Sequence, residues 1–473
     1  MTQSSMASQI PLIDDGKRET FGAQPLQRLT FFAFLQRYPI FILAFGPPIF
    51  RSSAVDVTKG ILDVWSFFQV GLLAAVTFRA IRRLAAPQVV FIPRQVRPIF
   101  GLAFTLGLLF LASSIYSPSR LTTVAYSILY FSMMICVLEF VVDVYRHPLD
   151  WIQCLFFFRS IGLLLVALAV LVFPFKPSLI VSYSEQIGMR IGGGLIAPFP
   201  LIFPIGAIIS AYAFLYSLEP RGRSLFYFLL CLAGTLMTRA RGGEISLLLP
   251  LVILGFGWSK TSKRSAYLFV SGIMASALLT SLTFATVGVG RIWSLFNKGE
   301  SAEGIKSASG RTDMWHFVIQ YCMAHPQGMG YVAGFREHFK QYYVLGMQLD
   351  PTHIGNAHNV LMQLLADAGW LALAVYLTMF VKIVFLAWRN TSRKGLASTT
   401  SNIGACHAIR CSLLLLICCF VGGLDAADFN VPMRQPFYWQ NIIIAIILGA
   451  SATLAPAMRQ GARLRENSSV VNL

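Results

Sequence analysis

The residue best suited to acid–base chemistry in this chain is His358, within the segment of residues 356–359. The pKa of a free imidazole, about 6.5, suits proton transfer near neutral pH. His358 directly follows a long polar segment, roughly residues 286–357, and directly precedes an apolar stretch. We therefore expect it at a water–lipid boundary, with Asn359 and His353 as candidate helpers. The alternative is a histidine that only caps or hydrogen-bonds the start of a helix.

Two arginines form the first candidate anion site. Arg239 and Arg241 are followed by two glycines and by an apolar stretch, residues 243–258. Guanidinium groups make bidentate, charge-assisted bonds to phosphate, and the N-terminus of a following helix attracts anions. We predict that both arginines bind a phosphate group. The alternative is that they snorkel to lipid headgroups.

A third arginine opens a segment with helical periodicity, residues 311–322. The spacing predicts an amphipathic helix. Its apolar face would consist of Met314, Trp315, Val318, Ile319 and Cys322, and its polar face of Asp313, His316 and Gln320. Arg311 falls on the apolar face, so it requires either an anionic ligand or a loop carboxylate such as Glu300 or Glu303. Arg291 is a weaker candidate for the same ligand.

Helix breakers at residues 325–330 predict the end of this helix. An aromatic group follows, made of Phe335, Phe339, Tyr342 and Tyr343. Because aromatic side chains favour membrane interfaces, we expect this group at the bilayer surface.

The elements that position these residues are membrane helices. Apolar residues make up 56% of the 473 residues and charged residues only 12%, against about 25% charged in soluble domains. We predict a single polytopic domain, residues 1–473, with an all-α fold of about twelve transmembrane helices. The predicted spans are 30–50, 61–79, 98–116, 122–145, 151–174, 195–218, 224–238, 243–258, 265–285, 359–388, 405–424 and 436–456.

The charge pattern predicts the orientation. The formal net charge of +18 comes mostly from Lys and Arg in the segments that face the cytoplasm if both termini do, such as Arg82, Arg83, Arg221, Arg223 and Lys263. This asymmetry follows the positive-inside rule and leaves residues 286–357 on the outer face. The basic excess therefore reports topology and does not indicate a nucleic-acid partner.

Several kinds of chemistry lack a sequence signal. The chain has no phosphate-binding loop or dinucleotide fingerprint, and no Cys/His spacing typical of zinc. The nearest carboxylate pair on the outer face, Asp425 and Asp428, is a weak metal candidate. Seven of the eight cysteines lie in or beside predicted spans, which leaves Cys322 alone in the large loop. We expect neither a cofactor nor a metal.

Three blocks in this order resemble the O-antigen ligase and polymerase superfamily of bacterial membrane glycosyltransferases. The blocks are Thr238-Arg-Ala-Arg-Gly-Gly, then Gly310-Arg-Thr-Asp-Met-Trp with Pro326-x-Gly-x-Gly, then His358-Asn-x9-Gly369. Ala372 departs from the last place of the family's histidine signature, and Asn356 stands where relatives often carry a second histidine. The O-antigen ligase-like region is predicted over residues 225–388.

The resemblance implies a GT-C-like fold, with residues 286–357 as a large periplasmic loop, in the bacterial inner membrane. It also implies metal-independent, inverting transfer of a glycan from an undecaprenyl-diphosphate-linked donor. His358 would be the general base, and Arg239, Arg241 and Arg311 would hold the diphosphate. The acceptor would be a glycan or lipid A-core, and flippase and chain-length regulator proteins would be candidate partners besides membrane lipids.

The block at residues 310–315 most resembles the exopolysaccharide polymerase branch. The alternative within the family is a ligase that attaches polysaccharide to lipid A-core. An alternative of another class is a transporter without covalent chemistry, which predicts ionisable residues at mid-membrane depth. Only Asp367 lies well inside a predicted span, so the sequence favours the enzyme.

Overall fold

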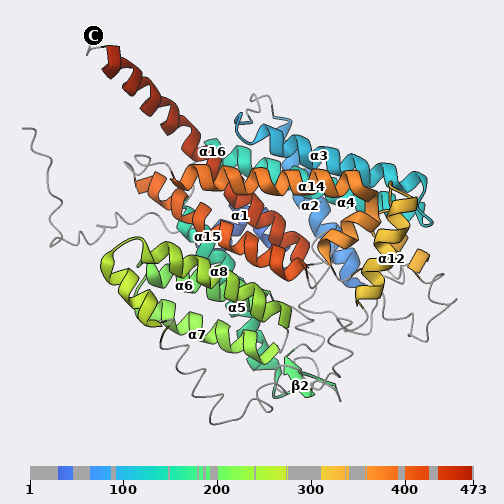
Figure 1. Ribbon diagram of the computed structural model, residues 1–473, viewed down its shortest axis with the longest axis horizontal. Coiled ribbons are helices and arrows are strands. Elements are labelled where there is room, and N and C mark those ends of the chain that lie inside the picture. The colour runs from blue at the N-terminus through green and yellow to red at the C-terminus, as the bar shows by residue number, and fades with distance from the viewer. Residues whose placement is uncertain are drawn as a thin grey trace, which may run out of the picture.

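The computed structural model is a bundle of helices with one small hairpin (Figure 1). It describes residues 30–45, 64–86, 92–146, 150–177, 181–184, 188–191, 201–238, 241–272, 274, 311–335, 337–339, 357, 359–392, 400–424 and 435–470. The elements are α1 (Phe31–Arg37), η1 (Pro39–Phe45), α2 (Val64–Leu84), α3 (Arg97–Ala112), η4 (Ser113–Ile115), α4 (Arg120–Arg146), α5 (Trp151–Val172), β1 (Val181–Ser184), β2 (Gly188–Ile191), α6 (Ile202–Leu215), α7 (Arg221–Thr238), α8 (Arg241–Ser259), α12 (Arg311–Ala324), α14 (Val360–Ser392), α15 (Thr400–Gly423) and α16 (Gln435–Val470).

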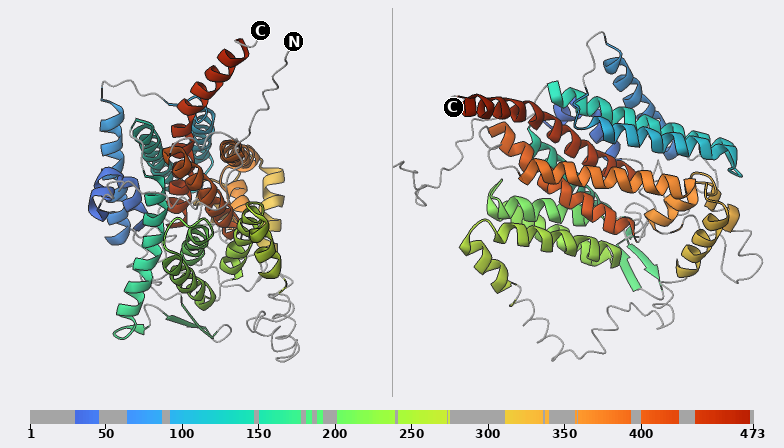
Figure 2. Two further views of the ribbon diagram at one scale, coloured as in Figure 1. Left: turned by 90° about the vertical axis from the view of Figure 1, so that its left-hand side faces the viewer. Right: turned by 45° about the horizontal axis from the view of Figure 1, so that its top comes forward.

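α15 and α16 form the centre of the bundle. α15 packs against α8 and α6 on one side and against α14 on the other, while α16 packs against α4 and α15 (Figures 1 and 2). The part of α16 from Pro436 to Leu454 is almost wholly buried, at 94% of an 18-residue window. A helix that is apolar on every side is stable only when protein or lipid surrounds it. This part of α16 is therefore internal, and the other helices pack around it.

Six helices of the described residues are long and apolar enough to cross a membrane, namely Arg97–Ile115, Arg120–Tyr145, Gly242–Ser259, Val360–Thr391, Ile403–Gly423 and Pro436–Leu454. The prediction of an apolar, helical membrane protein is confirmed at this level. Two shorter apolar helices, Trp151–Leu164 and Ile202–Leu215, match the predicted fifth and sixth spans in part. The full count of twelve spans stays a prediction.

Two predicted segments differ in detail from the structure. Residues 30–50 were predicted as one membrane span, but η1 follows the seven-residue α1 after a break at Tyr38. The fold was predicted to be all-α, but the connection after α5 contains an antiparallel hairpin in which Val181 pairs with Ile191 and Ser184 with Gly188. β2 lies against α7. Apart from this hairpin, the described elements are helices, as the predicted membrane fold requires.

The segments that carry the sequence motifs lie at one end of the bundle. Gly234 near the end of α7 lies against Phe203 at the start of α6, and Gly422 at the end of α15 lies against Leu201. α8 begins three residues after α7 ends, so its N-terminus is at the same end. This end, toward the right of Figure 1, is the motif end of the molecule.

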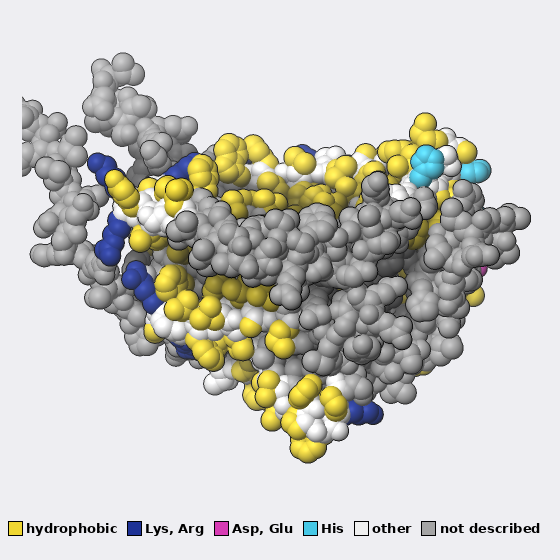
Figure 3. Space-filling view, turned by 60° about the horizontal axis from the view of Figure 1, so that its bottom comes forward, with side chains coloured by type: hydrophobic (Ala, Val, Ile, Leu, Met, Phe, Trp, Pro, Cys, Tyr) yellow, Lys and Arg dark blue, Asp and Glu magenta, His cyan; other side chains and the backbone are white. Residues whose placement is uncertain are grey.

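The opposite end carries a group of basic residues. It is formed by the last turns of α2 and α14, with Arg82, Arg83 and Arg389, and by the first turn of α7, with Arg221. In the space-filling view, Lys and Arg gather mainly toward the left of the molecule, whereas His side chains are exposed at the right (Figure 3). Among the described residues, Lys and Arg side chains are therefore concentrated at the end opposite the motifs.

Candidate functional site

The site is built around the start of α14. Asn359 is buried, and its Oδ1 accepts hydrogen bonds from the backbone N–H groups of Leu361 at 2.9 Å and Met362 at 3.2 Å. This satisfies two donors that the first turn of a helix leaves without partners. The Nδ2 of Asn359 donates to the carbonyl of Leu424, at the end of α15, at 3.2 Å. One side chain therefore caps α14 and ties it to α15.

Ala357, on the other side of position 358, is also fixed by two hydrogen bonds. The indole Nε1 of Trp315, on α12, donates to the carbonyl oxygen of Ala357 at 2.9 Å. The backbone N–H of Ala357 donates to Oε1 of Gln363, on the second turn of α14, at 2.9 Å. His358 itself lies outside the described residues, but its neighbours, Ala357 and Asn359, are each fixed by at least two hydrogen bonds.

α14 breaks one residue after Asp367, which corrects a prediction from the sequence. The predicted span 359–388 placed Gly369 inside one continuous helix. Instead Ala368 and Gly369 leave the helical conformation, with Gly369 at φ 75° and ψ −170°. A side chain at Gly369 would overlap the carbonyl oxygen of Pro326, which accepts a hydrogen bond from the backbone N–H of Trp370 at 3.1 Å. A backbone contact therefore requires glycine at this position.

The Pro326-x-Gly-x-Gly block makes that contact. The backbone N–H groups of Met329 and Gly330 donate to the carbonyls of Ala366 and Asp367, at 2.6 Å and 3.1 Å, on the last turn before the break. Gly328 and Gly330 have φ of +89° and +113°, a region that other residues rarely adopt. Residues 326–330 and residues 366–370 are thus bonded to each other through their backbones. We call this contact the joint.

Residues 326–331 are also joined to α3 and to η4 with its C-cap residue, Tyr116. The Tyr116 hydroxyl donates to the carbonyl of Gln327 at 2.5 Å, and the backbone N–H of Tyr331 donates to the Ser113 hydroxyl at 2.9 Å. The ring of Tyr331 stacks on Phe110 at 3.9 Å between centroids. Burial raises the pKa of Tyr116 to about 12, so its hydroxyl remains a donor at neutral pH.

The predicted helix over residues 311–322 is confirmed as α12, Arg311–Ala324, and its apolar face packs into a second hydrophobic core. Met314, Val318 and Cys322 are buried as expected, but Ile319 is 38% exposed and belongs to the outer face. Phe335 and Phe339 are also buried in this core, so the expectation that they lie at the bilayer surface was wrong. Tyr342 and Tyr343 lie outside the described residues.

The outer face of α12 carries a ring cluster that the sequence did not predict. The ring of Tyr321 packs against His325 at 4.6 Å and against His338 at 5.0 Å between centroids. Burial, reinforced by His325, lowers the pKa of His338. At neutral pH, His338 is therefore uncharged and packs against Tyr321 as a neutral ring.

The candidate phosphate ligands are described only in part. Arg311 is the first residue of α12 and its side chain is partly exposed. Arg241 is the first residue of α8, at the motif end, but its side chain lies outside the described residues. Arg239, Arg291 and His353 lie outside them as well, as do Asp425 and Asp428. The described part of the chain holds no cluster of three or more metal-ligating residues.

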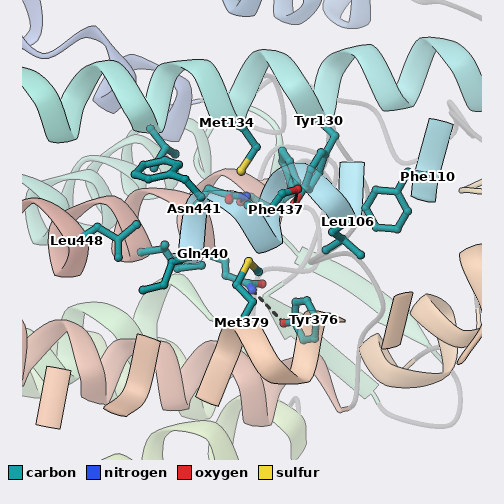
Figure 4. A pocket seen from close by; sticks show the side chains of 15 residues that line it. Leu106, Phe110, Tyr130, Met134, Tyr376, Met379, Phe437, Gln440, Asn441 and Leu448 are labelled. Atoms are coloured by element: carbon teal, nitrogen blue, oxygen red, sulfur yellow. Dashed lines mark hydrogen bonds between the residues drawn. The ribbon is translucent and has the colours of Figure 1, made fainter. Parts of the chain in front are cut away.

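A cavity lies deeper in the bundle, between α3, α4, α14 and α16 (Figure 4). Phe110, which stacks on Tyr331, lines it. Most of its wall is apolar, and Gln440 Nε2 donates to the Tyr376 hydroxyl at 3.0 Å within it.

Residues 226–377 match the family model described as O-Antigen ligase. The match supports the O-antigen ligase and polymerase superfamily for this chain, as the motifs predicted. It covers about a third of the sequence and contains every element of the joint described above except the anchors on α3, η4 and α15. A search for similar curated proteins found no match.

The matched region and the apolar helices together indicate a multi-pass protein of the bacterial inner membrane. They also indicate a glycosyltransferase-like enzyme of the O-antigen ligase or polymerase type, which implies a lipid-linked glycan donor and an acceptor.

Sequence reasoning missed two residues that belong to this arrangement. Gln363 was not considered, and Asp367 was noted only as an acid inside a span. Their i, i+4 spacing on one helix was the available signal, since such pairs meet on the helix surface. Trp315 was expected to pack, whereas its indole also donates to the carbonyl next to His358.

Proposed function

We propose that this protein transfers or polymerises a glycan from an undecaprenyl-diphosphate-linked donor at the periplasmic face of the inner membrane, as an exopolysaccharide or O-antigen polymerase does. The observation that supports this most is the restraint of the backbone on both sides of His358. Trp315, Gln363 and Leu424 bring α12, α14 and α15 to this one point. A general base must be held within hydrogen-bond reach of its substrate, and such restraint serves that need.

In the proposed reaction, an acceptor hydroxyl oxygen attacks the anomeric carbon of the donor glycan. His358 takes the hydroxyl proton while the bond from that carbon to the diphosphate oxygen breaks. Attack opposite the leaving group inverts the anomeric configuration. The lipid diphosphate leaves with both electrons of the broken bond, and no metal ion or nucleotide is consumed.

Arg239, Arg241 and Arg311 are proposed to bind the diphosphate and to stabilise its growing negative charge. Arg241 opens α8 and Arg311 opens α12, so each also stands at a helix N-terminus, where the helix dipole favours an anion. Arg291, His353 and Asn359 remain candidate helpers, with Asn359 acting through the cap it provides.

The test is transfer by purified protein in lipid nanodiscs, with a synthetic polyprenyl-diphosphate oligosaccharide as donor. His358→Ala should retain donor binding and lose about 10²–10⁴-fold in transfer rate. Arg241→Ala and Arg311→Ala should weaken donor use, and lysine should restore it poorly because it lacks the planar fork. Near wild-type transfer by His358→Ala would move the base elsewhere, to a carboxylate such as Asp313, on α12, or Glu337.

The family description favours a second candidate, a ligase that attaches finished polysaccharide to lipid A-core. The two differ in what a deletion strain accumulates. Loss of chain length with single repeat units still made supports the polymerase. Full-length polymer that remains on the lipid carrier supports the ligase.

A chelator separates the proposed mechanism from a metal-dependent one. Turnover should be unchanged in EDTA, because the proposed step uses only protein side chains. Strict dependence on a divalent cation would instead direct attention to Asp425 and Asp428.

A further inference from the structure

Asp367 and Gln363 form a buried polar pair that has no part in the proposed reaction. They stand one helical turn apart on α14 and are 0% and 1% exposed. Gln363 Nε2 donates to Asp367 Oδ1 at 2.8 Å, and Gln363 Oε1 accepts from the backbone N–H of Ala357 at 2.9 Å. The amide nitrogen can only donate and its oxygen can only accept, so the carboxyl group sets which way the amide faces.

The same carboxyl oxygen also contacts a second segment. Oδ1 of Asp367 accepts from the backbone N–H of Val332 at 2.9 Å. Val332 directly follows residues 326–331, which contact α14 at its break. The other oxygen, Oδ2, is buried and has no hydrogen-bond partner among the described residues. One oxygen therefore makes both of these contacts. Burial of a carboxyl group inside an apolar bundle is costly, so packing does not account for it.

The contacts form a continuous path toward position 358. It runs from the turn at Val332 through Asp367 and Gln363 to the N–H of Ala357, whose carbonyl is held in turn by Trp315. Because both polar groups of Ala357 are engaged, its peptide planes have little freedom, and the backbone of the next residue starts from a defined position.

On the basis of the proposed function, we propose that Asp367 is a positioning residue for glycan transfer. By fixing the Gln363 amide, it holds the Ala357 backbone and so aims His358 at the acceptor. It touches neither the donor nor the acceptor. Loss of this restraint should lower kcat and leave the KM for the donor unchanged, because the proposed phosphate ligands stand on α8 and α12.

Three single variants test the path. Asp367→Asn keeps an oxygen that accepts from Gln363 and Val332, so its kcat should stay within about threefold of wild type. Asp367→Leu removes that oxygen and should lower kcat by about 10- to 100-fold, the size expected for a misplaced catalytic group. Gln363→Glu sets two carboxyl groups against each other and should show a similar loss.

A double variant tests whether exchanging the amide and the carboxyl group restores the bond between positions 363 and 367. When Gln363→Glu and Asp367→Asn are combined, the amide is moved to position 367 and can donate its N–H to a carboxylate oxygen at position 363, in exchange for the bond that Asp367 accepts from the Val332 N–H. The carboxylate at position 363 again accepts from the N–H of Ala357, without a second carboxyl group against it. Partial recovery of kcat in the double variant, relative to Gln363→Glu alone, supports the path, because the bond between positions 363 and 367 returns while the bond to Val332 does not.

Gln440→Leu is the matched control for these variants. It removes another buried amide hydrogen bond of the bundle, the one to Tyr376, without a link to Ala357. Its kcat should stay close to that of the wild-type protein.

The outcomes separate the two proposals. If wild-type protein transfers no glycan, the proposed function fails. If wild-type protein transfers glycan and Asp367→Leu, eluting as a folded monodisperse peak, keeps its kcat, the positioning role is wrong and the function stands. If Asp367→Leu does not fold, the comparison of Gln363→Glu with the double variant decides, and equal kcat in those two overturns the role. An equal loss in Gln440→Leu overturns it too.

Discussion

At the scale of single residues, Asn359 shows how one side chain serves several contacts. The sequence marked it only as a neighbour of His358, yet its oxygen caps α14 and its nitrogen reaches the carbonyl of Leu424. Asn was predictable as a helix-start residue from its type and position. The bond to Leu424 was not predictable, because it joins residues 65 positions apart.

Substitution of Asn359 should separate these contacts. Asn359→Asp retains an oxygen for the cap but loses the donor to Leu424, whereas Asn359→Ala loses both. We expect Asn359→Ala to cost about 1 kcal/mol more than Asn359→Asp in the free energy of unfolding, the usual value of such a cap. Thermal unfolding of the detergent-solubilised variants measures this. Equal losses would mean that the cap contributes nothing.

Cys322 offers a second prediction at this scale. Its Sγ donates to the carbonyl of Leu365 at 3.3 Å, and burial raises its pKa to about 12. A thiol with that pKa is uncharged below about pH 10 and reacts slowly, because the thiolate is the nucleophile. We expect no maleimide labelling of Cys322 in folded protein at neutral pH, and labelling after denaturation. Rapid labelling of the folded protein would show that the second core opens.

At the scale of elements, the sequence predicted that α12 and α14 exist but not how they meet. Apolar spacing predicts a helix from local information, and both helices are present. The break at Gly369 has no proline to announce it. It depends on the backbone of residues 326–330, about forty positions earlier, so a pattern within one helix could not reveal it.

Gly369→Ala tests whether this break is required. Its φ of +75° disfavours any side chain, and a β-carbon would overlap the Pro326 carbonyl. We expect a large loss of stability, about 2 kcal/mol or more, seen as a lowered melting temperature, together with loss of transfer. Gly404→Ala, on α15 with open space around it, is the control and should be neutral or slightly stabilising. Equal behaviour of the two variants would contradict the role of the joint.

The contact between α12 and α14 has its own test. Trp315→Phe keeps an aromatic ring in the second core but removes the N–H that donates to Ala357. We expect kcat to fall while the melting temperature changes little, because the lost bond to a backbone carbonyl is worth only about 1 kcal/mol. Donor KM is the internal control and should be unchanged. A fall in melting temperature without a fall in kcat would make Trp315 a packing residue only.

At the scale of the whole molecule, composition predicted a membrane bundle, and six apolar helices of the described residues agree with it. Hydropathy was less reliable at residues 30–50 and 195–218, where the helices are broken or short. Such segments are held by neighbouring helices, a contact that a hydropathy window does not contain. The order of motifs along the chain likewise predicted the family resemblance, but not the joint that unites two of the motifs.

Orientation is the remaining property at this scale, and it decides whether the site faces the compartment that the mechanism requires. The end opposite the motifs carries Arg82, Arg83, Arg221 and Arg389, which the positive-inside rule places in the cytoplasm. We therefore expect an alkaline phosphatase fusion after Gly310 to be active and one after Lys394 to be inactive, with fluorescent-protein fusions giving the reverse. Neither position falls within a described helix, so neither fusion interrupts one. If both positions report the cytoplasm, the arginines at the motif end lie on the wrong side for a periplasmic reaction, and the proposed function is lost with the topology.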